Sequence, residues 1–400
     1  MIKALATIST VLCFIQTVGA GNFINEELPD SLLGPYYFKI ADSLYSTSKY
    51  KESNFYYIKA QNHFKQSEKT ENYLRCFVDL GFNLGMIAQY DSALVLLEKG
   101  LNEALNTVVQ YPKVISDFYS TIGVILDDKG HYDKAISYYK KDMKIDIEIN
   151  GLKHRSIAVS YNNIGVAYNN KGDYHTAIFY FQQALLVLKE SVDKITMSNA
   201  YFTNNMGEAY RQQKDLENAL KYYQQAFAIA YELKGKEHIS LALFYNNLGI
   251  AYMEMHDYFS SQHYYQKALT LQLAELDTNS KDVSISYFNI GELNLKMKKY
   301  DEALRYTKMA LEIKQSIFTS KHPLICQDLC GYGHVCLAKK EYAEALKYFQ
   351  LAMKANFLKF ENVDIFSDLN SDNMLSKEVF LDALIGKAET LEEMHGSSID

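Results

Sequence analysis

Four asparagines recur at an interval of 42 residues, and together their side chains could hydrogen-bond to a ligand. They are Asn163, Asn205, Asn247 and Asn289. Each amide offers both a hydrogen-bond donor and an acceptor, which is what the backbone of an extended peptide needs. Asparagine is disfavoured inside helices by up to ~0.7 kcal/mol relative to alanine, so four in register require an explanation. One explanation is a ladder that binds a peptide. The other is that the amides face solvent or bond to neighbouring helices.

The residues on the same predicted helix face define the ligand that would fit. Tyr201, Leu243 and Ile285 each lie about one helical turn before an asparagine and are apolar. The acidic residues of this face are Asp117, Asp128, Glu208, Glu254 and Glu292. The opposing cation is Lys296. Because an acidic ligand would meet like charges, the face predicts a neutral or basic extended segment.

A second periodic set superficially resembles a metal stripe on one predicted helix: His322, Cys326, Cys330 and His334. These residues spread over about 18 Å of helix, so one ion could use at most two of them. Cysteines on such a helix are more often buried apolar residues. The sequence also lacks a complete phosphate or dinucleotide loop and a set of nucleophile, base and orienting group. We therefore expect no catalytic residue, no metal and no cofactor.

The asparagines belong to a 42-residue repeat that runs through most of the chain. Its glycines are Gly81, Gly123, Gly165, Gly207, Gly249, Gly291 and Gly333. An aromatic residue or leucine follows each glycine by nine positions, and alanine or serine follows by twelve. A further small residue follows by nineteen, with Asp142 as the one misfit. Together with a degenerate first unit, the pattern predicts eight units over residues 35–356, each consisting of two helices joined by a tight turn.

Small residues at fixed positions indicate where helices cross closely. One hairpin cannot bury its own apolar face, but stacked neighbours share a continuous core, so the chain should be an all-α solenoid. The pattern resembles the tetratricopeptide repeat over about four fifths of the chain. Its longer unit, with extra residues such as 233–238 between hairpins, is similar to the kinesin-light-chain type. The resemblance implies a right-handed superhelix of about eight helix-turn-helix units that binds proteins and is not a catalyst.

Composition and the N-terminal residues suggest where the protein acts. A net charge of −7 without a basic stripe argues against nucleic acid as a partner. Lys3, a short apolar run and the small residues of 18–20 predict a cleavable signal peptide over residues 1–20, followed by a lead-in over 21–34. The alternative is a simple apolar N-terminal helix. No later segment is apolar enough for a stable membrane span, so we expect an extracytoplasmic protein, periplasmic or secreted.

After Asn356 the repeat pattern breaks. Residues 357–378 are an irregular, polar-rich linker, and residues 379–400 begin a further amphipathic helix from Val379 to Met394. Such a helix is a cap, pairs with a partner, or indicates that the chain is a fragment. Residues 381–388 resemble the segment that follows the repeats in bacterial proteins with a C-terminal CHAT (caspase-like) peptidase domain. No catalytic His or Cys of that domain can be assigned here.

Two functional hypotheses follow from the sequence. The first is a non-catalytic scaffold or adaptor that binds an extended peptide segment of a partner in its concave groove. The alternative is the N-terminal sensor or regulatory region of a larger effector or signalling enzyme, a CHAT-type peptidase or a histidine kinase, whose catalytic domain lies outside this chain.

Overall fold

The structure, a computed structural model, describes residues 30–191, 195–357 and 374–396. The predicted signal peptide and most of the predicted linker lie outside these residues. The first four hairpins pair α2 (Asp30–Ser46) with α3 (Tyr50–Gln66), α4 (Thr70–Met86) with α5 (Tyr90–Leu105), α6 (Pro112–Asp128) with α7 (Tyr132–Asn150), and α8 (Arg155–Lys171) with α9 (Tyr174–Ser191). The next four pair α10 (Met197–Gln212) with α11 (Leu216–Lys234), α12 (Leu241–Glu254) with α13 (Tyr258–Glu275), α14 (Lys281–Lys296) with α15 (Tyr300–Ile317), and α16 (Pro323–Ala338) with α17 (Tyr342–Ala355). A single helix, α18 (Lys377–Gly396), follows them.

These eight hairpins confirm the predicted all-α solenoid. Within the described residues there is no strand, only an isolated bridge between Phe357 and Met374. The second helix of each hairpin begins at the aromatic residue or leucine that lies nine positions after the repeat's glycine, or after Ala41 in the first hairpin. None of the helices that the structure describes is long and apolar enough to cross a membrane.

Each hairpin turns through one residue in the left-handed region of backbone space. Only two of these eight residues are glycine, and the full set is Ser48, Ala88, Gly130, Gly172, Lys214, His256, Lys298 and Lys340. A left-handed residue after the first helix lets the backbone N–H groups of the turn reach that helix's last carbonyls. At Gly172, for example, the N–H donates to the carbonyl of Asn169 at 2.9 Å. The same short turn in all units fixes how the two helices of each hairpin cross.

The repeated glycine makes room for a ring on the second helix. Five glycines face a ring sixteen positions later, in the pairs Gly123–Tyr139, Gly165–Phe181, Gly207–Tyr223, Gly249–Tyr265 and Gly333–Phe349. A Cβ atom on any of these glycines would lie only 2.5 to 2.8 Å from the facing ring. In the seventh hairpin, Gly291 faces Thr307. The glycine is therefore required by packing, because a side chain there would force the two helices apart.

Asp142, the misfit in the repeat, is buried and takes the place of a small core residue. Its two carboxylate oxygens accept hydrogen bonds from Ser116 Oγ at 2.5 Å and Ser160 Oγ at 3.1 Å. A buried carboxylate is tolerated where hydrogen bonds satisfy it. Burial nevertheless raises the pKa of Asp142 to about 6.

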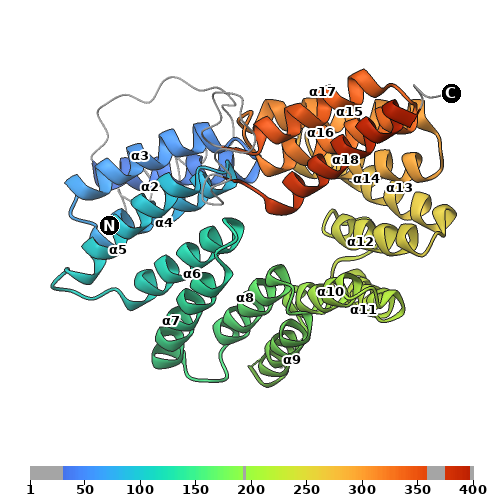
Figure 1. Ribbon diagram of the computed structural model, residues 1–400. Helices are drawn as coiled ribbons and strands as arrows, with labels where there is room; N and C mark the ends of the chain where they lie inside the picture. Colours follow the sequence, from blue (N-terminus) through green and yellow to red (C-terminus); the bar gives the residue numbers. More distant parts are fainter. Residues whose placement is uncertain (1–29, 192–194, 358–373, 397–400) are drawn as a thin grey trace.

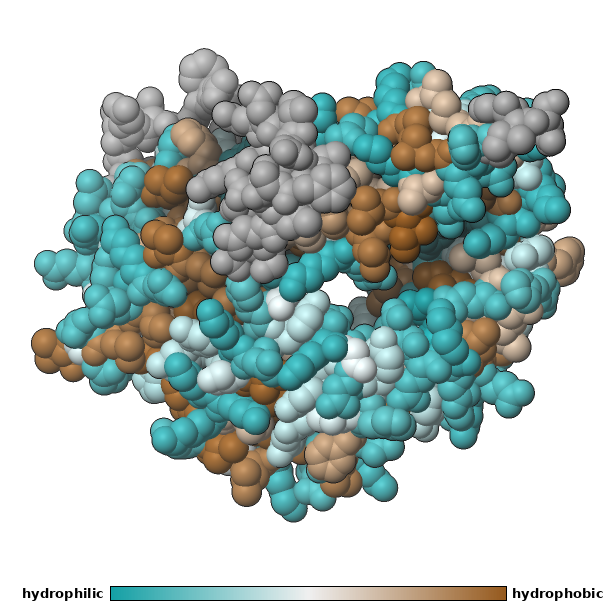
Figure 2. All heavy atoms as spheres, in the orientation of Figure 1, coloured by the Kyte–Doolittle hydropathy of each residue, from teal (hydrophilic) through white to brown (hydrophobic). Residues whose placement is uncertain are grey.

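The hairpins curve into a ring. The first helices of the hairpins line its inner side and the second helices its outer side (Figure 1). α18 packs on α16 and α17, in the place that the first helix of a ninth hairpin would take. The start of the solenoid, around α3 and α4, lies beside its end, around α15 to α18 (Figure 1). In the space-filling view an opening lies near the centre of the ring (Figure 2).

Candidate functional site

The predicted asparagine ladder lies on four successive first helices, α8, α10, α12 and α14, and all four side chains are partly exposed. Asn205 Nδ2 donates to Asn162 Oδ1 at 2.9 Å, and Asn247 Nδ2 donates to Asn204 Oδ1 at 2.7 Å. One of the two N–H donors of each of these amides is therefore engaged by the preceding helix. Within the described part of the chain, Asn163 and Asn289 make no side-chain hydrogen bond.

The sequence analysis missed the partners in this ladder. Asn162, Asn204 and Asn246 each lie one residue before a predicted ladder asparagine and are buried. Asn246 Nδ2 donates to Ser286 Oγ at 3.0 Å, which continues the pattern to α14. The signal that could have found them is the Asn-Asn pair that recurs in three successive repeats. Residues 42 or 43 positions apart become neighbours once the hairpins stack, so such pairs can bond from one unit to the next.

An exposed apolar row runs beside the asparagines, one helical turn earlier. Val159 is 38% exposed, Tyr201 39% and Leu243 45%, and Ile285 continues the row with partial exposure. Tyr201 stacks on Phe244, with ring centroids 5.8 Å apart. Val159 was not among the predicted residues, although it occupies the same repeat position. Four consecutive first helices thus each present one apolar side chain to the inner surface.

The predicted acidic face is partly neutralised by one arginine that the sequence analysis did not consider. Arg211 donates to both oxygens of Glu208, at 2.5 and 2.9 Å, and it also pairs with Glu254 on the next first helix. Tyr223 adds a hydrogen bond to Glu208 at 2.7 Å. Burial opposes ionisation of Glu208, but the contacts with Arg211 hold its pKa below the ordinary value. Glu208 and Glu254 therefore form a fixed network between units and are not free anions.

The remaining predicted charges lie towards the two ends of the groove. Asp128 and Lys296 are exposed at the ends of α6 and α14. Glu292, on α14, is partly buried, and burial raises its pKa. Asp117, on α6, forms an ion pair with Lys113 at 3.1 Å. Besides burial, Glu292 and Glu254 both raise the pKa of the Tyr265 hydroxyl, so Glu292 lies close to the network around Arg211.

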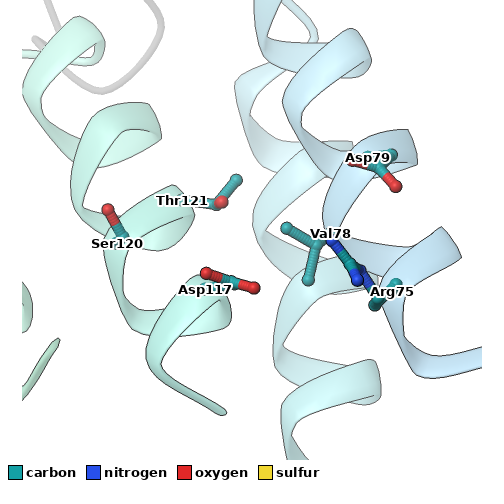
Figure 3. A pocket seen from close by; sticks show the side chains of 6 residues that line it. All are labelled: Arg75, Val78, Asp79, Asp117, Ser120 and Thr121. Carbon is teal, nitrogen blue, oxygen red and sulfur yellow. The ribbon is translucent and has the colours of Figure 1, made fainter. Parts of the chain in front are cut away.

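A small cavity lies at the α4 and α6 end of the groove. It has a volume of about 190 Å³, and Arg75, Val78 and Asp79 on α4 lie across it from Asp117, Ser120 and Thr121 on α6 (Figure 3). Burial, together with the nearby charge of Asp42, raises the pKa of Asp79 to about 7. The cavity thus combines carboxylates, a guanidinium and hydroxyls at the inner surface.

The other polar cluster singled out in the sequence has structural partners. His322 is the N-cap residue of α16, and its Nδ1 accepts the N–H of Leu324 at 3.1 Å. Cys326 and Cys330 are buried. His334 Nε2 contacts Asp382 Oδ1 on α18 at 3.0 Å. Among the described residues, no group of three or more His, Cys, Asp or Glu side chains has the arrangement of a metal site.

Comparison with known proteins identifies the class of protein that this fold and groove define. The sequence profile of the tetratricopeptide repeat family matches residues 115–190, 197–274, 240–316 and 282–356, which is more than half of the chain. The protein is therefore a member of the tetratricopeptide repeat family. Among curated protein sequences, none matches this chain.

Solved structures agree on the fold. A Rap protein complexed with competence and sporulation factor is 11% identical, with a TM-score of 0.54, and the match covers 91% of this chain and 99% of that one. The apo form of RapI is 17% identical, with a TM-score of 0.51, and covers 71% of this chain and 98% of its own. Kinesin-light-chain-like repeats also match: a putative kinesin light chain from Podosopora anserina is 16% identical over 51% of this chain and 97% of its own, with a TM-score of 0.41. At these identities the likeness concerns the fold alone.

Proposed function

We propose that this protein is a non-catalytic interaction scaffold that binds an extended segment of a partner protein along its inner surface. The observation that carries the proposal is the exposed apolar row of Val159, Tyr201, Leu243 and Ile285. Single exposed apolar residues are common on protein surfaces, but an aligned series of them is typical of a binding surface. The tetratricopeptide fold supports protein partners in general.

The spacing of the row suits an extended ligand. Packed helices lie about 8 to 10 Å apart, and an extended chain advances about 3.3 Å per residue, so roughly every third residue of the ligand would meet one repeat. An apolar ligand side chain would contact the row, and the adjacent backbone would meet an asparagine. Asn163 and Asn289 have whole amides available for this role, whereas Asn205 and Asn247 would offer their oxygen and one remaining N–H donor.

The charges favour a ligand that is neutral or basic. Arg211 compensates Glu208 and Glu254 opposite the centre of the row. The cavity at the α4 and α6 end contains the Arg75 guanidinium as well as Asp79 and Asp117, so a basic ligand side chain there would share these carboxylates with Arg75. We further infer, from residues 1–20, that the protein acts outside the cytoplasm, in the periplasm or after secretion.

The test is a selection of random dodecamer peptides on the immobilised full chain, followed by affinity measurement of the selected peptides. The double variant Tyr201→Ser with Leu243→Ser should weaken binding at least tenfold, because it removes apolar contacts on two adjacent repeats. Both side chains are substantially exposed, so the melting temperature should change little. Phe259→Ser is the matched control, since Phe259 is 84% exposed on the outer helix α13.

Two further double variants distinguish the asparagines without a side-chain partner from those that bond to a neighbouring hairpin. Asn163→Ala with Asn289→Ala should weaken binding of the selected peptides without a change in stability. Asn205→Ala with Asn247→Ala should instead also lower the melting temperature, since it breaks two bonds between hairpins. Equal affinity of the wild type and of both groove variants would refute binding along this surface.

One observation favours the alternative of a regulatory region of a larger enzyme. α18 exposes four large apolar side chains, Leu381, Leu384, Ile385 and Leu391. In the eight hairpins before it, the first helix packs against a second helix. A following domain or a partner would cover these side chains. Reading the gene past the codon for Asp400 separates the hypotheses, because a catalytic domain in frame supports the alternative and a stop codon removes it.

A further inference from the structure

The two ends of the solenoid meet at a seam. Tyr50, at the start of α3, and Ile87, just after α4, belong to the same buried apolar cluster as Phe318 and Ile325 near the start of α16. The rings of Tyr50 and Phe318 stack with centroids 6.4 Å apart. Hairpins one and two thus contact hairpins seven and eight, although these residues are more than 200 positions apart in the sequence.

A second contact strengthens the seam. Asn356, which is fully buried, accepts the N–H of Ser376 at 2.9 Å and donates to the Ser376 carbonyl at 2.7 Å. This arrangement fixes the residues just before α18. Leu375 among them is buried in the apolar cluster formed by α4 to α8. The ring is therefore closed by two apolar contacts that involve different residues.

His322 provides a directional bond across the seam. Its Nδ1 accepts the N–H of Leu324 in its own helix, and its Nε2 lies 3.2 Å from the carbonyl oxygen of Met86. Because Nδ1 accepts, Nε2 must carry the proton and donate, which defines a neutral imidazole. The side chain is only 7% exposed, and Phe318 stacks on it at 3.9 Å between centroids. A second proton would have to go on Nδ1, opposite the N–H that it now accepts.

Two lysines near His322 also oppose its protonation. Lys281 on α14 and Lys314 on α15 both act on it, and Lys314 is paired with Asp328 on α16. Across the seam, Asp282 acts on Tyr50. Burial is the main cause that lowers the pKa of His322 from 6.5 to about 4, the two lysines add to it, and the Met86 carbonyl acts in the opposite direction.

The seam differs from every other contact between hairpins. Neighbouring hairpins are joined by the chain and share a continuous core, whereas the seam joins units that are distant in sequence through non-covalent contacts alone. It is therefore the place where the ring can part without unfolding a hairpin.

We propose that the ring opens and closes at this seam, and that protonation of His322 favours the open form. In the open form the bond to Met86 is broken and the imidazolium reaches water. Closure has a consequence that rests on the proposed function: an extended segment inside a closed ring must enter by its end, whereas an open ring admits the middle of a long partner.

The direction and size of the pH effect follow from linkage. The closed form binds the proton less well than an exposed histidine does, so lowering the pH from about 6.5 towards 4 drives opening. Between pH 7.5 and pH 5, the ratio of open to closed molecules should rise about 30-fold.

Spin labels across the seam measure this ratio directly. Lys51 and Ser320 are exposed and lie within two residues of the stacked Tyr50 and Phe318. Cysteines at these two positions, in a Cys13→Ser background, would take the labels, because Cys76, Cys326, Cys330 and Cys336 are buried. Ile87→Ala weakens the seam and brings the open form into a measurable range. Pulsed electron resonance should show a short distance at pH 7.5 and a growing longer population at pH 5.

His322→Gln is the decisive variant, because glutamine cannot titrate but can donate to the Met86 carbonyl. Its open fraction should be the same at both pH values. His238→Gln is the matched control, since His238 Nδ1 accepts the N–H of Ser240 at the start of α12 in the same way, far from the seam. This control should keep the full pH response.

Three results would overturn the proposal. The open fraction could be independent of pH, the pH response could persist in His322→Gln, or the longer distances could appear only together with loss of helical circular dichroism. No ligand is used, so these outcomes are independent of whether the groove binds peptides.

Discussion

The buried ion pair between Lys314 on α15 and Asp328 on α16 allows a quantitative test of the packing between the last hairpins. The two side chains are 1% and 0% exposed, and Lys314 Nζ lies 2.6 Å from Asp328 Oδ1. Asp328 Oδ2 has no hydrogen-bond partner in the described part of the chain. Burial raises the pKa of Asp328 to about 6 and lowers that of Lys314. Each charge is therefore tolerated only because the other is present.

Replacing Lys314 with methionine leaves Asp328 buried without a counter-ion. The folded chain can then escape the cost of a buried charge by binding a proton on Asp328. The pKa of Asp328 in the wild type is already about 6, so holding this carboxyl protonated at pH 7 costs about one further pH unit, or about 1.4 kcal/mol. At pH 5 Asp328 is mostly protonated in the wild type as well, so the same reasoning gives almost no loss of stability from this source. Removing both charges, in Lys314→Met with Asp328→Leu, should recover most of the stability.

The assay is urea unfolding at pH 7 and pH 5, followed by far-ultraviolet circular dichroism. Lys308→Met is the matched control, because Lys308 lies on the same helix and its ion pair with Glu312, at 3.8 Å, is exposed on both sides. That control should cost less than about 1 kcal/mol. A loss for Lys314→Met as small as that of the control, or equal losses at the two pH values, would refute the reasoning.

Two further variants test the repeat itself. Asp142→Asn should raise stability by roughly 1 to 2 kcal/mol at pH 7 and by little below pH 4. The pKa of Asp142 is raised in the folded state, so the wild type loses stability as the pH rises from about 4 to 6. A melting temperature that is lowered equally at both pH values would contradict this. Gly249→Ala should lower stability by about 1 to 2 kcal/mol, because the new Cβ would lie 2.5 Å from the buried Tyr265 ring and the gain in helix propensity offsets only part of that cost. Tyr265→Leu in the same chain should relieve the clash, and a Gly249→Ala melting temperature equal to that of the wild type would contradict the packing argument.

The sequence was sufficient to predict the hairpins because their determinants are local and recur in every unit. Each repeat contains its own glycine, the ring sixteen positions later and the small residues between them. The structure places the glycine and the ring in contact. The alanine positions are equally informative, since Ala177, Ala219 and Ala303 are fully buried.

The groove was harder to predict because its properties depend on contacts between repeats. Arg211 reaches Glu254 at a separation of 43 residues, and Asn205 reaches Asn162 at the same separation. Such pairs can be found only after the hairpins are stacked in register. The seam is even harder to predict from the sequence, because it depends on the small rotation at each hairpin, summed over the whole array. No residue near His322 or Met86 indicates that the two would meet.

Closure of the ring also alters how the protein should fold and unravel. An open array of repeats has two free ends, each held by one neighbour, so it can fray from either end and grow from any nucleus. In this protein the first and last units also hold each other, through contacts such as the one between His322 and Met86. Loss of either terminal unit would therefore remove two interfaces and not one. The final step of folding must bring together segments separated by most of the chain, a slow kind of contact in a protein whose other contacts form between sequence neighbours.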